Sequence, residues 1–324
     1  MKKFVFYLTV IFSLISMSCA SNKIVNALST GLAGANEKGI PNKQKKAKKN
    51  TKPDAMFAIT SDSDITLVGD FFPTALKMYE ILQSQNPEHL GLMSQTGALN
   101  VMYANAFVQS QAELLPIDQF DKQNEEFIRA EYHYLKGRDL CLKALDGRHK
   151  GFKNLIESAD ENQISKAVDM LDKNDVTTAY WLGAGWLGAF SLDPLNPELL
   201  GNLSAPVSVL EKALSLKNDY VDVYEVLARF YAAAPEGFGG NMEKGMEYCE
   251  TAMKLTGGTT PNPYIIKAEC FCIPTGDEEG FVNNLNKALK INPDDNPSTR
   301  LTTTISQKKA KKLLDSKSDY FLEW

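Results

Sequence analysis

The sequence has few of the residues from which metal and catalytic sites are usually built. Its 324 residues include 3 histidines and 5 cysteines. The histidines, His89, His133 and His149, do not have the spacing of zinc ligands. The chain also lacks a Gly-x-Ser-x-Gly nucleophile motif and a glycine-rich phosphate loop followed by Lys-Ser/Thr. We therefore expect neither an enzyme nor a protein that needs a metal or a cofactor.

Positive charge and β-strand patterns are scarce as well. The net charge is −5 and the sequence pI is about 5.4, so the chain lacks the overall basic character of a nucleic-acid-binding protein. Few stretches alternate apolar and polar residues, whereas a period of 3.6 residues covers most of the chain. The sequence therefore predicts an all-α protein that does not bind nucleic acid.

Only the N-terminus carries a long apolar run, from Phe4 to Met17, and it is too short to span a bilayer comfortably. The run follows two lysines and ends just before Cys19, which is the pattern of a bacterial lipoprotein signal. We predict a signal peptide over residues 1–18 and lipid attachment at Cys19; the alternative is an ordinary secretory peptide. Ala20 rather than Asp follows the cysteine, which favours anchoring in the outer membrane, facing the periplasm.

A lysine-rich segment follows the predicted lipid attachment site. Residues 31–53 carry six lysines between 43 and 52 and almost no apolar side chains, so they cannot bury enough surface to fold. We predict a flexible, lipidated tether over residues 19–59, which either is solvated or adheres to anionic lipid head groups. The folded domain is expected to span residues 60–324.

A three-residue signature recurs along this domain, with spacings of four and then three residues that keep the side chains on one helix face. A matching pattern, such as Thr96-Gly97-x2-Asn100, precedes several copies. The two patterns together are typical of tetratricopeptide (TPR) hairpins, so we predict a TPR-like solenoid of degenerate hairpins with insertions; an irregular helical bundle is the alternative. The signatures are Ala75-Tyr79-Leu82, Gly137-Cys141-Ala144, Pro206-Leu210-Ala213, Gly245-Cys249-Ala252 and Phe281-Leu285-Ala288.

The same periodicity predicts individual helices. Residues 192–205, with Pro194 and Pro197, are expected to form an irregular insertion. The expected helices are 72–84, 93–115, 120–145, 161–171, one that contains Trp181 and Trp186, 206–216, 221–234, 242–255, 264–272, 278–291 and 300–314.

Stacked hairpins form a concave groove that is lined by the first helix of each pair. In this register the predicted groove residues are Tyr180, Asp222, Glu225, Arg229 and Glu269, with Arg229 as the expected carboxylate binder. Two other interpretations remain open. Glu225 and Arg229 are four residues apart and could form a surface ion pair, and Tyr180 could belong to the core.

The order of several short segments resembles the TatT family, the TPR-type lipoprotein component associated with TRAP transporters. The resemblance runs from Cys19 almost to the end of the chain. The segments that carry it are Leu67-Val68-Gly69-Asp70, Pro73-x-Ala75-Leu76-Lys77-x-Tyr79-Glu80, Tyr134-Leu135-Lys136-Gly137-Arg138-Asp139, Ala179-Tyr180-Trp181 with Trp186, Tyr231-Ala232-Ala233-Ala234-Pro235, Gly239-Gly240-Asn241, and Lys267-Ala268-Glu269 with Phe271.

The resemblance implies a periplasmic, membrane-anchored protein that works beside the solute-binding protein of a TRAP transporter. It also implies a small carboxylate-bearing or hydrophobic solute as ligand, and a homo-oligomer, for which a trimer is one expected form. The alternative function is a TPR lipoprotein scaffold for outer-membrane or cell-wall assembly. A periplasmic hydrolase that uses Glu225 or Glu269 is a further, less supported hypothesis.

Overall fold

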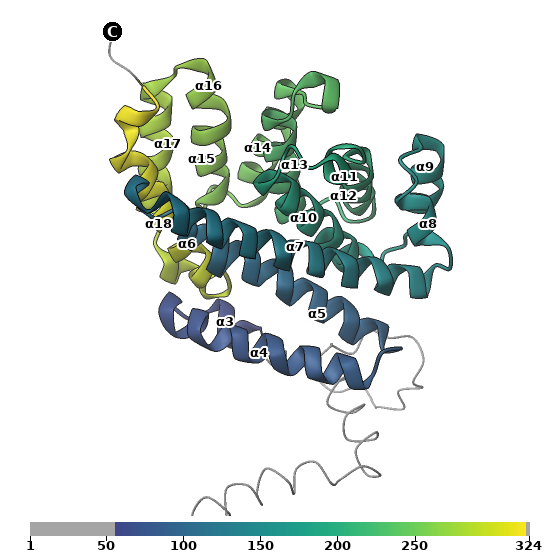
Figure 1. Cartoon of the computed structure of the whole chain (residues 1–324). Helices are drawn as coiled ribbons and strands as arrows, with labels where there is room; N and C mark the ends of the chain where they lie inside the picture. Colours follow the sequence, from purple (N-terminus) through teal and green to yellow (C-terminus); the bar gives the residue numbers. More distant parts are fainter. Residues whose placement is uncertain (1–55, 322–324) are drawn as a thin grey trace, which may run out of the picture.

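The computed structural model of the protein describes residues 56–321, all of whose regular elements are helical (Figure 1). The predicted all-α class is confirmed for these residues. The predicted signal peptide, Cys19 and the tether up to residue 55 lie outside them. The α-helices are α3 (Phe57–Thr60), α4 (Ile65–Gln85), α5 (Leu90–Tyr103), α6 (Ser110–Ala112), α7 (Phe120–Arg148), α8 (Phe152–Ile156), α9 (Glu161–Asp169), α10 (Val176–Leu192), α11 (Pro197–Leu200), α12 (Ser204–Leu216), α13 (Val221–Ala233), α14 (Met242–Leu255), α15 (Asn262–Lys267), α16 (Ile273–Thr275), α17 (Glu278–Lys290) and α18 (Arg300–Asp315).

Three long helices, α4, α5 and α7, lie side by side along one edge of the molecule (Figure 1). The contact between α5 and α7 is close because glycines face each other there. A Cβ added at Gly97 would lie 2.8 Å from the carbonyl oxygen of Gly137, and one at Gly137 would lie 2.7 Å from that of Gly97. Only glycine lets the two backbones approach this far.

Some predicted helix boundaries are wrong, because local capping and bulges decide them. The first long helix begins at Ile65 rather than at residue 72, since the Asp64 side chain accepts a hydrogen bond from the backbone N–H of Leu67 and caps it there. Residues 93–115 form α5, the π-helix η1 (Ala104–Gln109) and α6 instead of one regular helix. The predicted irregular insertion contains the short helix α11.

The second half of the chain folds into successive helices that pack on their neighbours, from α12 through α13, α14, α15 and α17 to α18. All three residues of the second to fifth signatures are buried, as the predicted packing requires. The first signature is only half-buried, because Phe72 and Leu76 fill the core in place of Ala75 and Tyr79. These burials support the helix pairing; the TPR-like solenoid itself stays a prediction.

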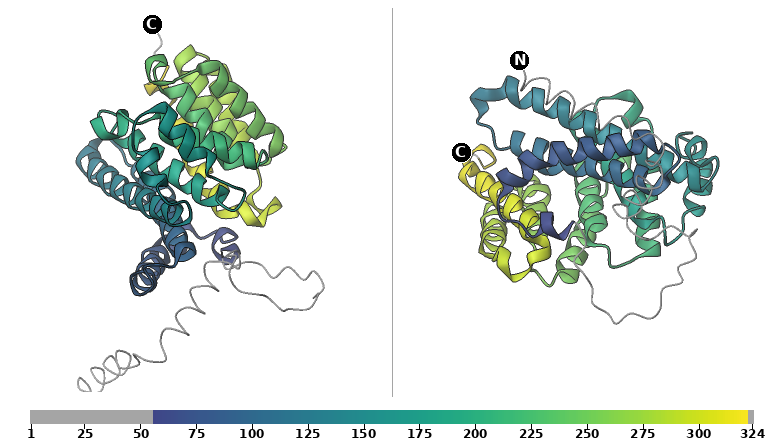
Figure 2. Two further views of the ribbon diagram at one scale, coloured as in Figure 1. Left: turned by 90° about the vertical axis from the view of Figure 1, so that its right-hand side faces the viewer. Right: turned by 90° about the horizontal axis from the view of Figure 1, so that it is seen from below.

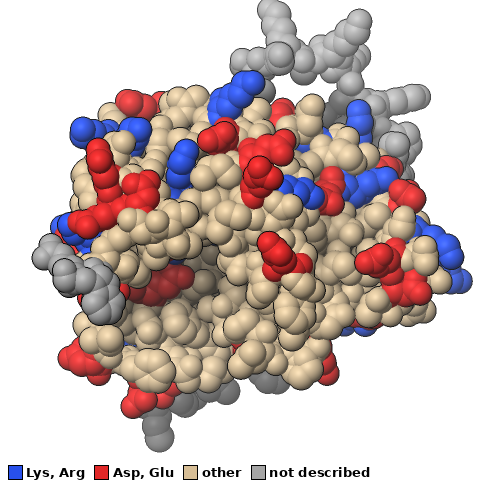
Figure 3. All heavy atoms as spheres, turned by 90° about the horizontal axis from the view of Figure 1, so that it is seen from above, with Lys and Arg blue, Asp and Glu red and all other residues tan. Residues whose placement is uncertain are grey.

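The last helix returns to the first ones. α18 contacts α3 and α4, and the Arg300 guanidinium donates a hydrogen bond of 2.7 Å to the carbonyl oxygen of Ser61. Figure 2 shows the yellow C-terminal helices beside the purple N-terminal ones when the molecule is seen from below. Seen from above, the molecule is hollowed, and acidic side chains line part of the hollow (Figure 3).

Candidate functional site

Charged side chains from distant parts of the chain meet in one network. Arg229 on α13 lies 2.7 Å from Glu269. The ammonium of Lys309 on α18 lies 2.9 Å from Glu269 and 3.1 Å from Glu113, which follows α6. The four side chains alternate in sign and retain between 18 and 37% exposure. The network therefore ties α18 to both halves of the fold while it stays in contact with solvent.

Two π-helices lie at the network. Glu269 belongs to η4 (Ala268–Cys272), and Glu113 follows closely after η1. A π-helix inserts an extra residue into a helical turn and shifts the side chains that follow it, and such bulges are frequent at functional sites. Here they accompany the two carboxylates that meet Lys309.

Glu225 lies on α13 one turn before Arg229 and makes different contacts. Its carboxylate accepts a hydrogen bond of 3.0 Å from the Asn262 side chain, which in turn accepts one of 2.8 Å from Ser306 on α18. Burial, and secondly the charge of Asp222, raise the pKa of Glu225 to about 8. Glu225 is therefore largely protonated at neutral pH and can donate a hydrogen bond.

Asp222 and Tyr180 complete this region. Asp222 is exposed at the surface. The protein atoms around its carboxyl group nevertheless keep some water away and raise its pKa, against the opposing effect of the Lys217 charge. The Tyr180 ring packs against two aromatic neighbours, with its centroid 4.6 Å from that of the Trp181 ring and 5.0 Å from that of the Tyr220 ring. Burial, then Asp222, raises the pKa of its hydroxyl.

The structure thus places all five predicted groove residues in one region of the fold. Tyr180 interacts with Asp222 and Glu225, Glu225 interacts with Arg229, and Arg229 pairs with Glu269. The alternative of a surface ion pair between Glu225 and Arg229 is wrong, because each has a closer partner on another helix. That these residues bind a ligand stays a prediction.

Sequence analysis missed Lys309, Glu113 and Asn262. Lys309 lies in a basic stretch of α18 that looks like any solvated helix end, and no periodicity marks it. Only the return of α18 to the N-terminal half of the molecule brings it to Glu113. The residue chemistry was visible in the sequence, whereas the pairing was not.

The groups of the site are charged and hydrogen-bonding side chains. Burial raises the pKa of the Cys270 thiol, which lies near Arg229, so it is not an activated nucleophile. Within residues 56–321, no group of three potential metal ligands comes together.

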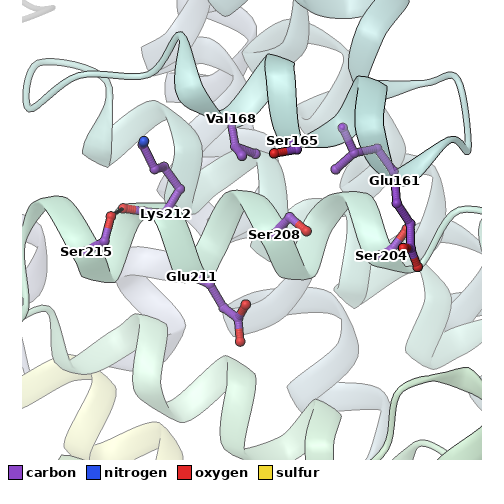
Figure 4. Close-up of a pocket in the computed structure, with 9 residues that line it drawn as sticks. Glu161, Ser165, Val168, Ser204, Ser208, Glu211, Lys212 and Ser215 are labelled. Carbon is purple, nitrogen blue, oxygen red and sulfur yellow. Dashed lines mark hydrogen bonds between the residues drawn. The ribbon is translucent and has the colours of Figure 1, made fainter.

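A separate groove of about 430 Å³ lies between α9 and α12. Ser165 on α9 and Ser204, Ser208 and Ser215 on α12 line it, together with Glu211 and Lys212 (Figure 4). The groove is hydroxyl-lined, and none of the five predicted groove residues belongs to it.

Comparison with known proteins identifies the family. The model of the TRAP transporter T-component family matches residues 61–321. The chain belongs to this family. It is also 40% identical, over 266 residues and 82% of each chain, to an uncharacterised protein of Treponema pallidum (strain Nichols). The T-component family is one of accessory proteins of transporters rather than of enzymes.

The matched residues of this T-component include every helix of the site, from α6 to α18. No helix within the described residues has the length and apolar character needed to cross a membrane. The family match confirms the predicted resemblance over residues 61–321. The role of the site residues is the part that remains to be proposed.

Glu225→Gln is expected to make stability depend less on pH. The folded-state pKa of about 8 lies above the ordinary value of 4.5, so the folded chain binds the proton more tightly and wild-type stability falls as pH rises through this window. At pH 8.5 we expect the free energy of unfolding of the variant to exceed that of the wild type by about 1–3 kcal/mol. This is less than the whole pKa difference between the folded and unfolded states would give, because Glu225 is partly exposed to solvent. Urea unfolding at pH 5 and 8.5 measures the difference.

The matched control is Glu247→Gln, on the exposed side of α14. It should unfold like the wild type at both pH values. Equal behaviour of Glu225→Gln and Glu247→Gln would mean that Glu225 is ionised in the folded protein.

Proposed function

We propose that this T-component binds a solute-binding protein, a small ligand, or both, through the site formed by Tyr180, Asp222, Glu225, Arg229 and Glu269, and so serves TRAP-type solute uptake. The observation that carries the proposal is the convergence of these residues, from three separate helical segments, on one partly exposed charged region. Family membership supplies the transport context.

The electrostatics of the site support a binding role. Arg229 and Lys309 form ion pairs with Glu269 and Glu113. A charged ligand could therefore replace one of these ion-pair partners, and it would not have to bind an isolated buried charge. Beside them, the protonated Glu225 offers a donor, and Tyr180 offers an aromatic face and a hydroxyl. A small solute with a carboxylate and an apolar part suits this combination of groups.

The wider setting is also a proposal. We infer a TPR-like repeat domain of residues 60–324, held at the outer membrane through a lipid on Cys19 and a tether of residues 19–59, facing the periplasm. The protein would act as a homo-oligomer. The apolar N-terminal run, Cys19 and the lysine-rich segment support this arrangement.

Capture of the tagged full chain from its native membranes, followed by mass spectrometry, tests the function. We expect a periplasmic solute-binding protein or a TRAP membrane subunit among the main partners. Arg229→Gln should reduce the amount of that partner captured with the protein about tenfold, because the loss of one charge-assisted hydrogen bond costs about 1.5 kcal/mol or more. Arg138→Gln, on α7 and paired with its neighbour Asp139, is the control.

Recovery of barrel-assembly or cell-wall proteins instead would contradict uptake and favour the scaffold function. If Glu225 were catalytic, Glu225→Gln would abolish turnover. On the binding proposal, this variant keeps the captured partner.

A further inference from the structure

Three serine hydroxyls in the groove between α9 and α12 have no hydrogen-bond partner within the described residues. They belong to Ser165 on α9 and to Ser204 and Ser208 on α12. A serine inside a helix often donates to a backbone carbonyl one turn earlier, as Ser84 and Ser110 do in this chain. Ser165 and Ser208 also have a helical turn before them, yet their hydroxyls stay available to the groove.

The other side chains of the groove are arranged around these hydroxyls. Figure 4 shows Glu161 beside Ser204 at one end of the groove, with Lys212 toward the other end. Ile164 and Val168 of α9 add apolar surface to the lining. The groove thus combines a carboxylate at one end, hydroxyls along its length and an apolar wall.

The charges of the groove are largely neutralised inside the protein. The Lys212 ammonium lies 3.2 Å from the Asp169 carboxylate. Glu211 points away from α9 (Figure 4) and pairs with Lys244. Of the charged side chains that line the groove, only Glu161 makes no hydrogen bond or ion pair within the described residues, and it is exposed. A ligand here therefore meets mainly hydrogen-bonding groups and little net charge.

We propose that the groove binds a small neutral saccharide. A sugar hydroxyl both donates and accepts hydrogen bonds, as a serine hydroxyl does, so each of the three serines can pair with it in either role. The carboxylate of Glu161 accepts from a sugar hydroxyl, while Ile164 and Val168 can cover the C–H face of a sugar ring. The groove volume of about 430 Å³ is within the usual range of small-molecule sites.

The affinity of this groove is expected to be low. Without a ligand, water hydrates the serine hydroxyls, and a sugar gains only where its own hydroxyls reproduce those hydrogen bonds. Ser165 and Ser204 are exposed at the surface, so the protein covers a ligand from one side only. We therefore expect a dissociation constant of about 1 mM.

Charged ligands fit the groove less well. An anion would need Lys212, whose ammonium already pairs with Asp169, and it would approach the carboxylate of Glu161. A zwitterion such as dialanine could place its ammonium at Glu161, but its carboxylate would have to displace Asp169 from Lys212. Binding of either ligand would weaken as salt is added, whereas binding of a neutral saccharide would not.

Saturation-transfer NMR of the purified full chain, in a detergent without a sugar head group, tests the proposal. The probes are maltose, cellobiose and N,N′-diacetylchitobiose, and at least one should bind saturably with an affinity that added salt leaves unchanged. Ser208→Ala should weaken this binding about fivefold, because one neutral hydrogen bond is lost. Ser165→Trp, which fills the groove from α9, should abolish it.

The matched control is Ser84→Ala on α4, whose hydroxyl donates to the carbonyl oxygen of Ile81 outside the groove. It should bind the disaccharide like the wild type. The absence of a saturable signal from all three disaccharides would overturn the proposal, and so would unchanged binding by Ser208→Ala and Ser165→Trp. Salt-sensitive binding of dialanine or inorganic phosphate in place of the sugar would also overturn it and would identify a charged ligand.

This inference does not rest on the proposed transport function. The groove shares no lining residue with the site of Tyr180, Asp222, Glu225, Arg229 and Glu269. Ser165→Trp should therefore leave the capture of a transport partner unchanged, and a label placed in the groove would carry a sugar and not that partner. Either proposal can fail while the other holds.

Discussion

Replacing Glu269 with glutamine is expected to destabilise the fold by about 2–4 kcal/mol at pH 7. Glu269 is the shared partner of Arg229 and Lys309, at 2.7 and 2.9 Å. Glutamine keeps the shape but leaves two cations facing each other in a partly buried place with only Glu113 to balance them. Removal of one member of such a network costs more than the network contributes as a whole. Chemical unfolding monitored by circular dichroism measures the loss.

The pH dependence of this loss follows from the same contacts. Burial alone would raise the Glu269 pKa, but Lys309 and Arg229 outweigh it and hold the pKa below 4.5. A carboxyl with a depressed pKa stabilises the fold above its unfolded-state pKa, and this contribution disappears as pH falls through the folded-state pKa. Wild type and variant should therefore converge in acid.

Glu250→Gln is the control, because Glu250 lies 3.5 Å from Lys267 but is 62% exposed. Its unfolding free energy should change by no more than about 0.5 kcal/mol. An equally small effect at Glu269 would show that the network is solvated and does not join α18 to the rest of the fold.

Gly97→Val is expected to cost about 3 kcal/mol or to prevent folding. The first added carbon at Gly97 would lie 2.7 Å from the Cys141 sulfur and 2.8 Å from the Gly137 carbonyl oxygen. The oxygen belongs to the backbone of α7 and cannot turn away, so α5 and α7 would have to separate along a contact that is otherwise wholly buried. Thermal unfolding of the purified protein, or its soluble yield, measures the effect.

The matched substitution is Gly237→Val, in the turn between α13 and α14. A Cβ at Gly237 meets nothing within 4 Å, and its backbone does not need a positive φ. Stability should stay within about 1 kcal/mol of the wild type. If Gly97→Val were tolerated as well, the close crossing of α5 and α7 would not be required for the fold.

The sequence predicted the elements whose apolar faces repeat. The buried triplets of α7, α12, α14 and α17 all lie at the predicted positions, because spacings of three and four fix one helix face whatever surrounds it. The helix expected at 242–255 is observed with those bounds. There the Asn241 side chain caps the N-terminus, and the chain turns at Gly257 and Gly258 with positive φ.

The π-helices and the contacts between distant helices could not be predicted from the local sequence. The π-helices η1 and η4 shift the register inside helices whose composition looks regular. Asp175 stands at the N-cap position of α10, yet its buried carboxylate does not cap the helix and pairs with Arg148 and His149 instead. The contact between Lys309 and Glu113 joins residues nearly two hundred positions apart and follows from closure of the whole fold. The predicted groove residues share one region because their positions depend on helix register, whereas their partners on other helices depend on tertiary closure and were missed.

The central claim is that the region of Tyr180, Asp222 and Glu225 meets a transport partner. The most direct measurement places a photo-crosslinking amino acid at Asp222 in the full chain, in native membranes, and identifies what becomes attached. Position 161, in the groove between α9 and α12, is the matched control. We predict a solute-binding protein, or a small solute, attached at position 222 and absent at position 161. Equal labelling at both positions, or attachment of envelope-assembly proteins at 222, would contradict the account.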